Sequence, residues 1–164
     1  MSEIQLVFFR HGIAEDNVIP DQERPLTEEG RRKTRAAAEG LRTLEIPFDT
    51  VFTSPWRRAA QTAAIVAEVL SCGAPKELPE LAGNRTAKEL LDALGRHNTG
   101  NVLLVGHQPL LGDAVAQLLG AGDKCEIDLR KSGACAVQVS SLPSRRPAVL
   151  QWLLTSKQLR AIGK

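Results

Sequence analysis

Short runs of consecutive apolar residues alternate along the chain with longer segments in which apolar residues recur every three or four positions. A continuous apolar run is typical of a strand covered on both faces, and the recurring pattern is typical of a helix with one buried side. Five strands are predicted in this way: residues 4–9, 48–53, 101–105, 134–140 and 149–154. The alternation of strands and helices predicts an α/β fold with a mostly parallel sheet. The last two strands are consecutive, which indicates an antiparallel addition or hairpin at one edge.

Residues that favour helix ends set the limits of the helical segments. Thr27 is suited to cap a helix that runs to about residue 44, before Pro47. Ser54 followed by Pro55 predicts the start of a second helix, with Ser54 as its N-cap and an end near residue 70. Three later segments are also predicted as helical: residues 86–96, 110–119 and 156–164. Polar, proline-containing segments predict connectors over residues 13–26 and 72–81.

Length and composition indicate one folded domain. The chain has 164 residues, of which 43% are hydrophobic and 24% are charged. These values are those of a globular protein that can bury its own core. We therefore expect residues 1–164 to form a single domain. Twenty-one Lys and Arg against 19 Asp and Glu give a net charge of +2, a balance that excludes a protein built mainly around nucleic-acid phosphates.

The sequence predicts a cytoplasmic location. Its three cysteines are odd in number and form no Cys-x-x-Cys pair, as expected for reduced thiols. No stretch approaches the roughly 20 apolar residues of a membrane span, so no membrane partner is expected. The start of the chain, Met1 to Glu3, lacks the basic and apolar regions of a signal peptide.

Basic and imidazole side chains gather directly after the first three predicted strands. In open α/β sheets ligands bind beyond the carboxyl ends of the strands, so these positions predict one common rim. Arginine grips oxyanions through forked hydrogen bonds, and histidine can serve as nucleophile, base or donor. The group therefore predicts a phosphate pocket. Its members are Arg10, His11, Ser54, Arg57, Arg58 and His107.

Other interpretations of these residues remain open. Arg57 and Arg58 are adjacent, so on a helix they point about 100° apart and at most one enters the pocket. A zinc site would need three or four suitably spaced ligands, whereas His97 is better explained as a residue at a helix C-terminus. The basic run at residues 31–33 predicts a solvated helix face, with a docking patch for an acidic partner as the alternative.

Four motifs in the same order resemble the histidine phosphatase superfamily, also called the phosphoglycerate mutase-like superfamily. Phe8-Phe9-Arg10-His11-Gly12 resembles its RHG signature. Residues 24–30 resemble its PLTxxG segment, residues 53–63 its SPxxRAxQTA segment, and residues 105–109 its second-histidine motif. The short length, residues 78–81 and the ending at 151–159 are most similar to the small phosphohistidine phosphatases of the SixA type.

The resemblance implies a three-layer α/β/α sandwich with a mostly parallel central sheet and an antiparallel edge strand. It also implies that His11 is the nucleophile and forms a phosphohistidine intermediate. Arg10, Arg58 and His107 would hold the phosphoryl oxygens and offset their charge. No metal or organic cofactor is implied, because the arginines neutralise the phosphate.

Two further residues match the superfamily by position. Many members protonate the leaving group with a Glu after the second helix, and Glu80 is the candidate here; the alternative is a solvated loop carboxylate. Asn17 lies where mutase-like members often have a phosphate-contacting Asn, although its flanking residues differ. Both are predicted as site residues, Glu80 as general acid and Asn17 in substrate binding.

The resemblance predicts hydrolysis of phosphohistidine on a phosphotransfer protein, and the alternative substrate is a small phosphomonoester metabolite. The short segment between Glu80 and the strand before His107 predicts an uncovered rim, which suits a phosphorylated side chain presented by another protein. A noncatalytic phosphoprotein-binding module is a third possibility, which the presence of all four pocket residues disfavours. The sequence indicates no oligomeric state.

Overall fold

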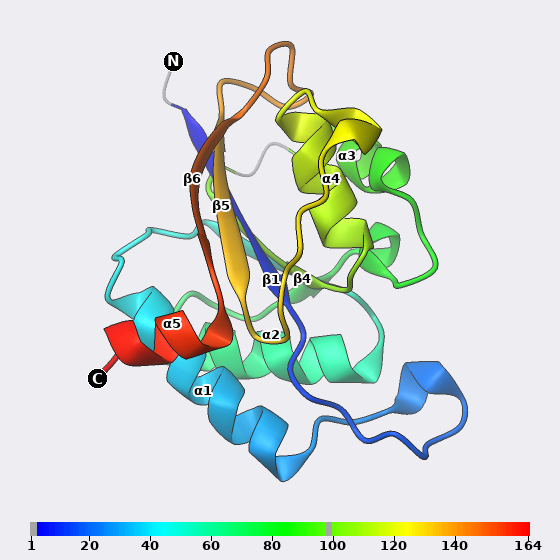
Figure 1. The fold of residues 1–164 in the computed structure, drawn as a ribbon, viewed down its shortest axis with the longest axis vertical. Helices are drawn as coiled ribbons and strands as arrows, with labels where there is room; N and C mark the ends of the chain where they lie inside the picture. Colours follow the sequence, from blue (N-terminus) through cyan, green and yellow to red (C-terminus); the bar gives the residue numbers. More distant parts are fainter. Residues whose placement is uncertain (1–2, 98–99) are drawn as a thin grey trace.

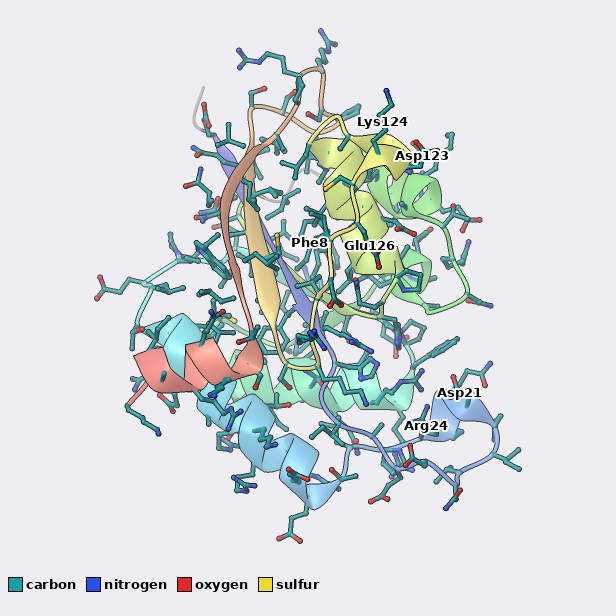
Figure 2. The ribbon with its side chains drawn as sticks, in the orientation of Figure 1. Phe8, Asp21, Arg24, Asp123, Lys124 and Glu126 are labelled. Carbon is teal, nitrogen blue, oxygen red and sulfur yellow. The ribbon has the colours of Figure 1, made fainter. Side chains whose placement is uncertain are left out.

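Side chains alternate across the strand β1 (Ile4–Arg10) and belong to two separate cores. In a computed structural model, which describes residues 3–97 and 100–164, Leu6 and Phe8 enter one core while Val7 and Phe9 enter the other. Figure 2 labels Phe8 on the side of the sheet that faces α4 (Leu110–Leu118). The continuous apolar run of β1 is thus explained by burial on both faces.

The described residues form a six-stranded sheet in the order β3-β2-β4-β1-β5-β6. Its other strands are β2 (Thr50–Thr53), β3 (Lys76–Glu77), β4 (Val102–Gly106), β5 (Ala134–Val139) and β6 (Val149–Leu154). Neighbours from β3 to β1 are parallel, whereas β5 is antiparallel to both β1 and β6. The mostly parallel sheet with an antiparallel edge is therefore confirmed.

Helices cover both faces of this sheet (Figure 1). On one face, side chains of α1 (Glu28–Arg42), α2 (Arg57–Leu70) and α5 (Ser156–Ile162) share the core of Val7 and Phe9. On the other face, α3 (Ala87–Gly95) and α4 share the core of Leu6 and Phe8. The three-layer α/β/α sandwich is confirmed. No helix in the described ranges is long and apolar enough to cross a bilayer.

The predicted elements differ from the structure mainly at their ends. Thr27 caps α1 as predicted, because its Oγ1 accepts a hydrogen bond from Gly30 N at 2.8 Å. The prediction for Ser54 is wrong: α2 begins at Arg57, and Trp56 occupies the N-cap position. The two-residue strand β3 lies inside the segment predicted as a connector. Met1 and Ser2, at the start of the chain considered above, lie outside the described residues.

Candidate active site

The carboxyl ends of β1, β2 and β4 meet at one edge of the sheet. The pairing of Arg10 with Gly106 places His11 and His107 at equivalent positions, directly after neighbouring strands. Arg58 reaches the same edge from the first turn of α2. Together they line a pocket of about 260 Å³, so the predicted rim exists in the fold. The lining residues are Arg10, His11, Ala14, Arg24, Trp56, Arg58, Gly83, His107, Gln108 and Lys131.

The ring of His11 is held in one orientation by its own backbone. Its Nδ1 lies 2.7 Å from the carbonyl oxygen of Gly12, and a carbonyl only accepts, so Nδ1 carries the proton. Nε2 is then an acceptor, and Arg58 Nε donates to it at 3.3 Å. Burial is the largest cause that lowers the pKa of His11 to about 4, followed among the lowering causes by Arg58 and Arg10. At neutral pH, Nε2 is therefore unprotonated, and its electron pair accepts the hydrogen bond from Arg58.

Gly12 and Thr62 join β1 to α2 directly behind this ring. The Gly12 amide donates to Thr62 Oγ1 at 3.0 Å, and the same hydroxyl donates to the carbonyl of Arg58 at 2.7 Å. A Cβ atom on residue 12 would collide with Thr34 Oγ1. The glycine of the RHG motif is thus required by close packing between the loop after β1 and α1.

Asp21 holds the guanidinium of Arg58 from the opposite side. Arg58 Nη1 donates to the Asp21 carbonyl at 2.8 Å, and Nη2 donates to Asp21 Oδ2 at 3.1 Å. Asp21 also accepts from Arg24 Nη1 at 2.9 Å, and Figure 2 shows these two residues close together on the loop before α1. Arg24, followed by Arg58, lowers the pKa of the Asp21 carboxyl. Arg58 is 6% exposed, whereas Arg57 points to solvent.

His107 is held through its other ring nitrogen. Its Nε2 lies 2.8 Å from Ser54 Oγ, which already accepts the amide proton of Trp56 at 3.1 Å. We assign the Ser54 hydroxyl proton to the bond with Nε2, which places the ring proton of neutral His107 on Nδ1. Burial, followed by His11 and Arg58, lowers the pKa of His107 to about 3. The two imidazole centroids are 5.1 Å apart.

Two buried polar atoms of the described residues have no hydrogen-bond partner: Arg10 Nε and His107 Nδ1. Both belong to side chains that line the pocket. Arg10 is otherwise anchored by Nη1, which donates to the Leu129 carbonyl at 3.0 Å. Buried donors normally find an acceptor, and an oxyanion can accept from both a guanidinium and an imidazole. The pocket is therefore chemically suited to a phosphoryl group.

Glu80 and Asn17 lie outside the pocket that Arg10, His11, Arg58 and His107 line. Glu80 Oε1 lies 3.4 Å from Arg96 Nη2, and its side chain is 19% exposed. Asn17 is exposed on the loop after β1. Neither is among the residues that line the pocket, and both roles stay predictions. Within residues 3–97 and 100–164, no three His, Cys, Asp or Glu side chains are grouped as metal ligands.

The sequence analysis missed several lining residues, and the direction of β5 explains one of them. Because β5 is antiparallel to β1, its first residue Ala134 pairs with Phe9 at the carboxyl end of β1. The residues before β5 therefore reach the same rim, and Lys131 lines the pocket. The basic pair Arg130-Lys131 before an antiparallel strand was the available signal. Trp56 contacts His107 edge-on, with ring centroids 4.8 Å apart.

Comparisons with known proteins show which family the sequence resembles. A family model described as histidine phosphatase superfamily (branch 1) matches residues 6–83. Phosphohistidine phosphatase SixA of Escherichia coli K12 is 34% identical over 119 residues, which cover 70% of this chain and 74% of that protein. An uncharacterized protein of Picosynechococcus sp. is 35% identical over 135 residues, covering 79% of this chain and 82% of its own.

Solved structures show the same likeness over nearly the whole chain. A structure of the protein histidine phosphatase SixA complexed with tungstate has a TM-score of 0.85 and 26% identity, covering 95% of this chain and 99% of that one. A mycobacterial glucosyl-3-phosphoglycerate phosphatase has a TM-score of 0.72 at 18% identity, covering 94% and 100%, and shares the fold. From its sequence relatives, its fold and the residues gathered in its pocket, the chain belongs to the histidine phosphatase superfamily.

Proposed function

We propose that the protein removes phosphoryl groups from phosphohistidine on another protein, with residues 1–164 acting as one catalytic domain. The observation that carries the proposal is the orientation of His11. Its proton lies on Nδ1, and its unprotonated Nε2 lies beside the Arg58 guanidinium in the pocket. This is the arrangement that a nucleophilic imidazole requires.

The reaction has two steps at phosphorus. In the first, His11 Nε2 attacks in line, its bond to phosphorus forms, and the phosphorus–nitrogen bond of the substrate breaks. The leaving imidazole keeps the bonding electron pair and takes a proton from solvent. In the second step water attacks the phosphohistidine of the enzyme, which yields inorganic phosphate and restores His11. Arg10, Arg58 and the Nδ1 proton of His107 stabilise the phosphoryl oxygens in both steps.

The composition of the pocket supports a phosphohistidine substrate. The described lining residues are arginine, lysine, histidine, an amide and apolar groups, while the Glu80 carboxylate pairs with Arg96. An alkoxide leaving group gains much from a positioned acid, whereas imidazole is a far better leaving group and needs little assistance. The E. coli relative, which carries the name phosphohistidine phosphatase, supports the same substrate class.

A small phosphomonoester is the second candidate substrate, and the position of Glu80 favours it. Glu80 lies in the 3-10 turn Pro79–Leu81, and Gly83, two residues after that turn, lines the pocket. Its Oε1 is 3.4 Å from Arg96, an exposed arginine, so the carboxylate is not locked by a short bond. A rotation of Glu80 toward the pocket would supply a general acid.

The test is phosphate release from a phosphohistidine-bearing phosphotransfer protein and, in parallel, from a panel of alkyl phosphates. Wild type, His11→Ala and Glu80→Gln are compared, with Glu77→Gln on the neighbouring exposed strand as the matched control. We expect fast release from the phosphoprotein that depends on His11 and is retained in Glu80→Gln. Turnover of alkyl phosphates alone, with a loss of about 10²–10⁴-fold in Glu80→Gln, would instead establish the phosphomonoester activity.

A further inference from the structure

A second, larger cavity lies beside the phosphoryl pocket and is strongly basic. Its volume is about 490 Å³. We define the basic groove by its five cationic lining residues: Arg10, Lys33, Arg130, Lys131 and Arg160. They come from the end of β1, from α1, from the loop before β5 and from α5. Figure 1 shows α1 and α5 side by side near the end of β6. Segments far apart in the sequence thus contribute charge of one sign to one surface.

Cations outnumber carboxylates in the basic groove. Lys33 Nζ pairs with Glu29 at 2.8 Å, and Arg130 Nε pairs with Asp128 at 3.2 Å. Arg160 Nε instead donates to the hydroxyl of Ser156 at 3.3 Å, and Arg10 is anchored on the carbonyl of Leu129. Of the described residues that line the groove, five are cations and none is a carboxylate, although the whole chain has a net charge of only +2. The groove concentrates the positive charge of the molecule at one place.

The groove adjoins the pocket, because Arg10 and Lys131 line both. Residues that flank a phosphorylated side chain in the pocket can therefore reach these two cations. The groove also offers Ile13 as an apolar contact, and it is larger than the pocket of about 260 Å³. Its size and position suit a segment of polypeptide that extends beyond the phosphoryl group.

We propose that the basic groove binds acidic side chains of the protein that presents the phosphohistidine. This proposal rests on the function proposed above. The sequence left open that residues 31–33 form a docking patch for an acidic partner. Of these three residues, Lys33 lines the groove, so the proposal assigns that role to Lys33 alone. Complementary charge would raise the rate of encounter and orient the substrate before its phosphoryl group enters the pocket.

The experiment uses the full chain and two phosphohistidine peptides of equal length, one flanked by Asp and Glu and the other by Asn and Gln. The double variant Arg130→Gln/Arg160→Gln removes two groove charges that do not line the pocket. The matched control is Arg85→Gln/Lys88→Gln, which removes two ion-paired cations beside and on α3. Para-nitrophenyl phosphate reports on the pocket alone, and fluorescence anisotropy measures binding of the unphosphorylated acidic peptide.

We expect kcat/KM for the acidic peptide to fall about 2- to 30-fold in the groove variant, since each exposed ion pair contributes about 0.2–1 kcal/mol. The neutral peptide, para-nitrophenyl phosphate and the control variant should be unaffected, and salt should reduce the preference for the acidic peptide. Equal kcat/KM for both peptides in wild type, or an equal loss with para-nitrophenyl phosphate, would overturn the proposal. Specific binding of the acidic peptide without phosphate release would support the groove while refuting the phosphohistidine activity.

Discussion

The ends of β1 and β4 make an instructive comparison, because each strand delivers one buried histidine to the same pocket. The strands are parallel neighbours, and both histidines have lowered pKa values. Their partners differ. His11 is held at Nδ1 by the next carbonyl along the chain, whereas His107 is held at Nε2 by Ser54 from the end of β2. Opposite ring nitrogens are left for chemistry.

In the function proposed above, this difference gives His11 and His107 different tasks. At His11 the remaining nitrogen has a lone pair and can attack phosphorus. At His107, in the tautomer assigned above, the remaining nitrogen carries a proton and can donate to a phosphoryl oxygen. Both rings are buried, so the hydrogen-bond partner of each ring decides whether its remaining nitrogen suits a nucleophile or a hydrogen-bond donor.

Replacing His11 and His107 in turn should give the largest difference in kcat and in phosphoenzyme formation. His11→Ala should lower kcat on the order of 10⁴–10⁶-fold, because the reaction loses its nucleophile. His107→Gln should lower kcat about 10²–10³-fold, because one oxyanion donor is lost. Rapid-quench experiments with labelled phosphate should show a phosphoenzyme in His107→Gln and none in His11→Ala. Label on His107 in His11→Ala, or no phosphoenzyme in His107→Gln, would reverse the assignment.

Replacing the adjacent residues Arg57 and Arg58 in turn should show which arginine acts beside His11. Arg58→Ala should cost about 3–4 kcal/mol of transition-state stabilisation, because its buried guanidinium donates to His11 Nε2 and lies where phosphoryl charge develops. Arg57→Ala, on the exposed side of the same turn, should change kcat/KM by less than about threefold. Steady-state kinetics of both variants provides the test, with thermal unfolding as the control for folding. An exchange of the two effects would show that Arg57, and not Arg58, acts in the pocket.

Ser54→Ala should loosen the control of the His107 tautomer, although Ser54 itself does not line the pocket. The loss of one hydrogen bond to a buried ring costs about 1–3 kcal/mol of stability, and a ring proton free to move between nitrogens should lower kcat about 5- to 10-fold. Nitrogen chemical shifts of His107 report the tautomer directly: Nδ1–H in the wild type and a mixture in the variant. An unchanged tautomer would show that Ser54 does not set the position of the proton.

The smallest expected difference between His11 and His107 is in their pKa values. By NMR, His11 should protonate near pH 4 and His107 near pH 3, well below the ordinary value of about 6.5. Between the folded and unfolded pKa values only the unfolded chain binds these protons. The free energy of unfolding should therefore fall as the pH drops from about 6.5 toward 4. Protonation of both rings near pH 6.5 would contradict the burial that lowers their pKa values.

Much of the fold and the centre of the site were predictable because they depend on local patterns. The apolar run before Arg10 marked a strand covered on both faces, and the rule for carboxyl ends then brought His11, Arg58 and His107 together. What failed depends on tertiary contacts. Ser54 has the sequence of a helix cap, but it bonds to His107 from a different strand. Strand β3 is only two residues long, and its pairing with β2 leaves no periodic pattern.

The central place of β1 in the sheet has a consequence for how the protein is made. Both neighbours of this strand, β4 and β5, are synthesised long after it, as shown by the hydrogen bond between Gln5 and Asn101, 96 residues apart. A nascent chain therefore carries an unpaired apolar segment, Ile4–Phe9, through most of its translation. Such segments are prone to aggregate, and pairings of this range slow folding. We expect the emerging chain to depend on chaperones, and His11 to reach its place in the pocket only after β4 and β5 have left the ribosome.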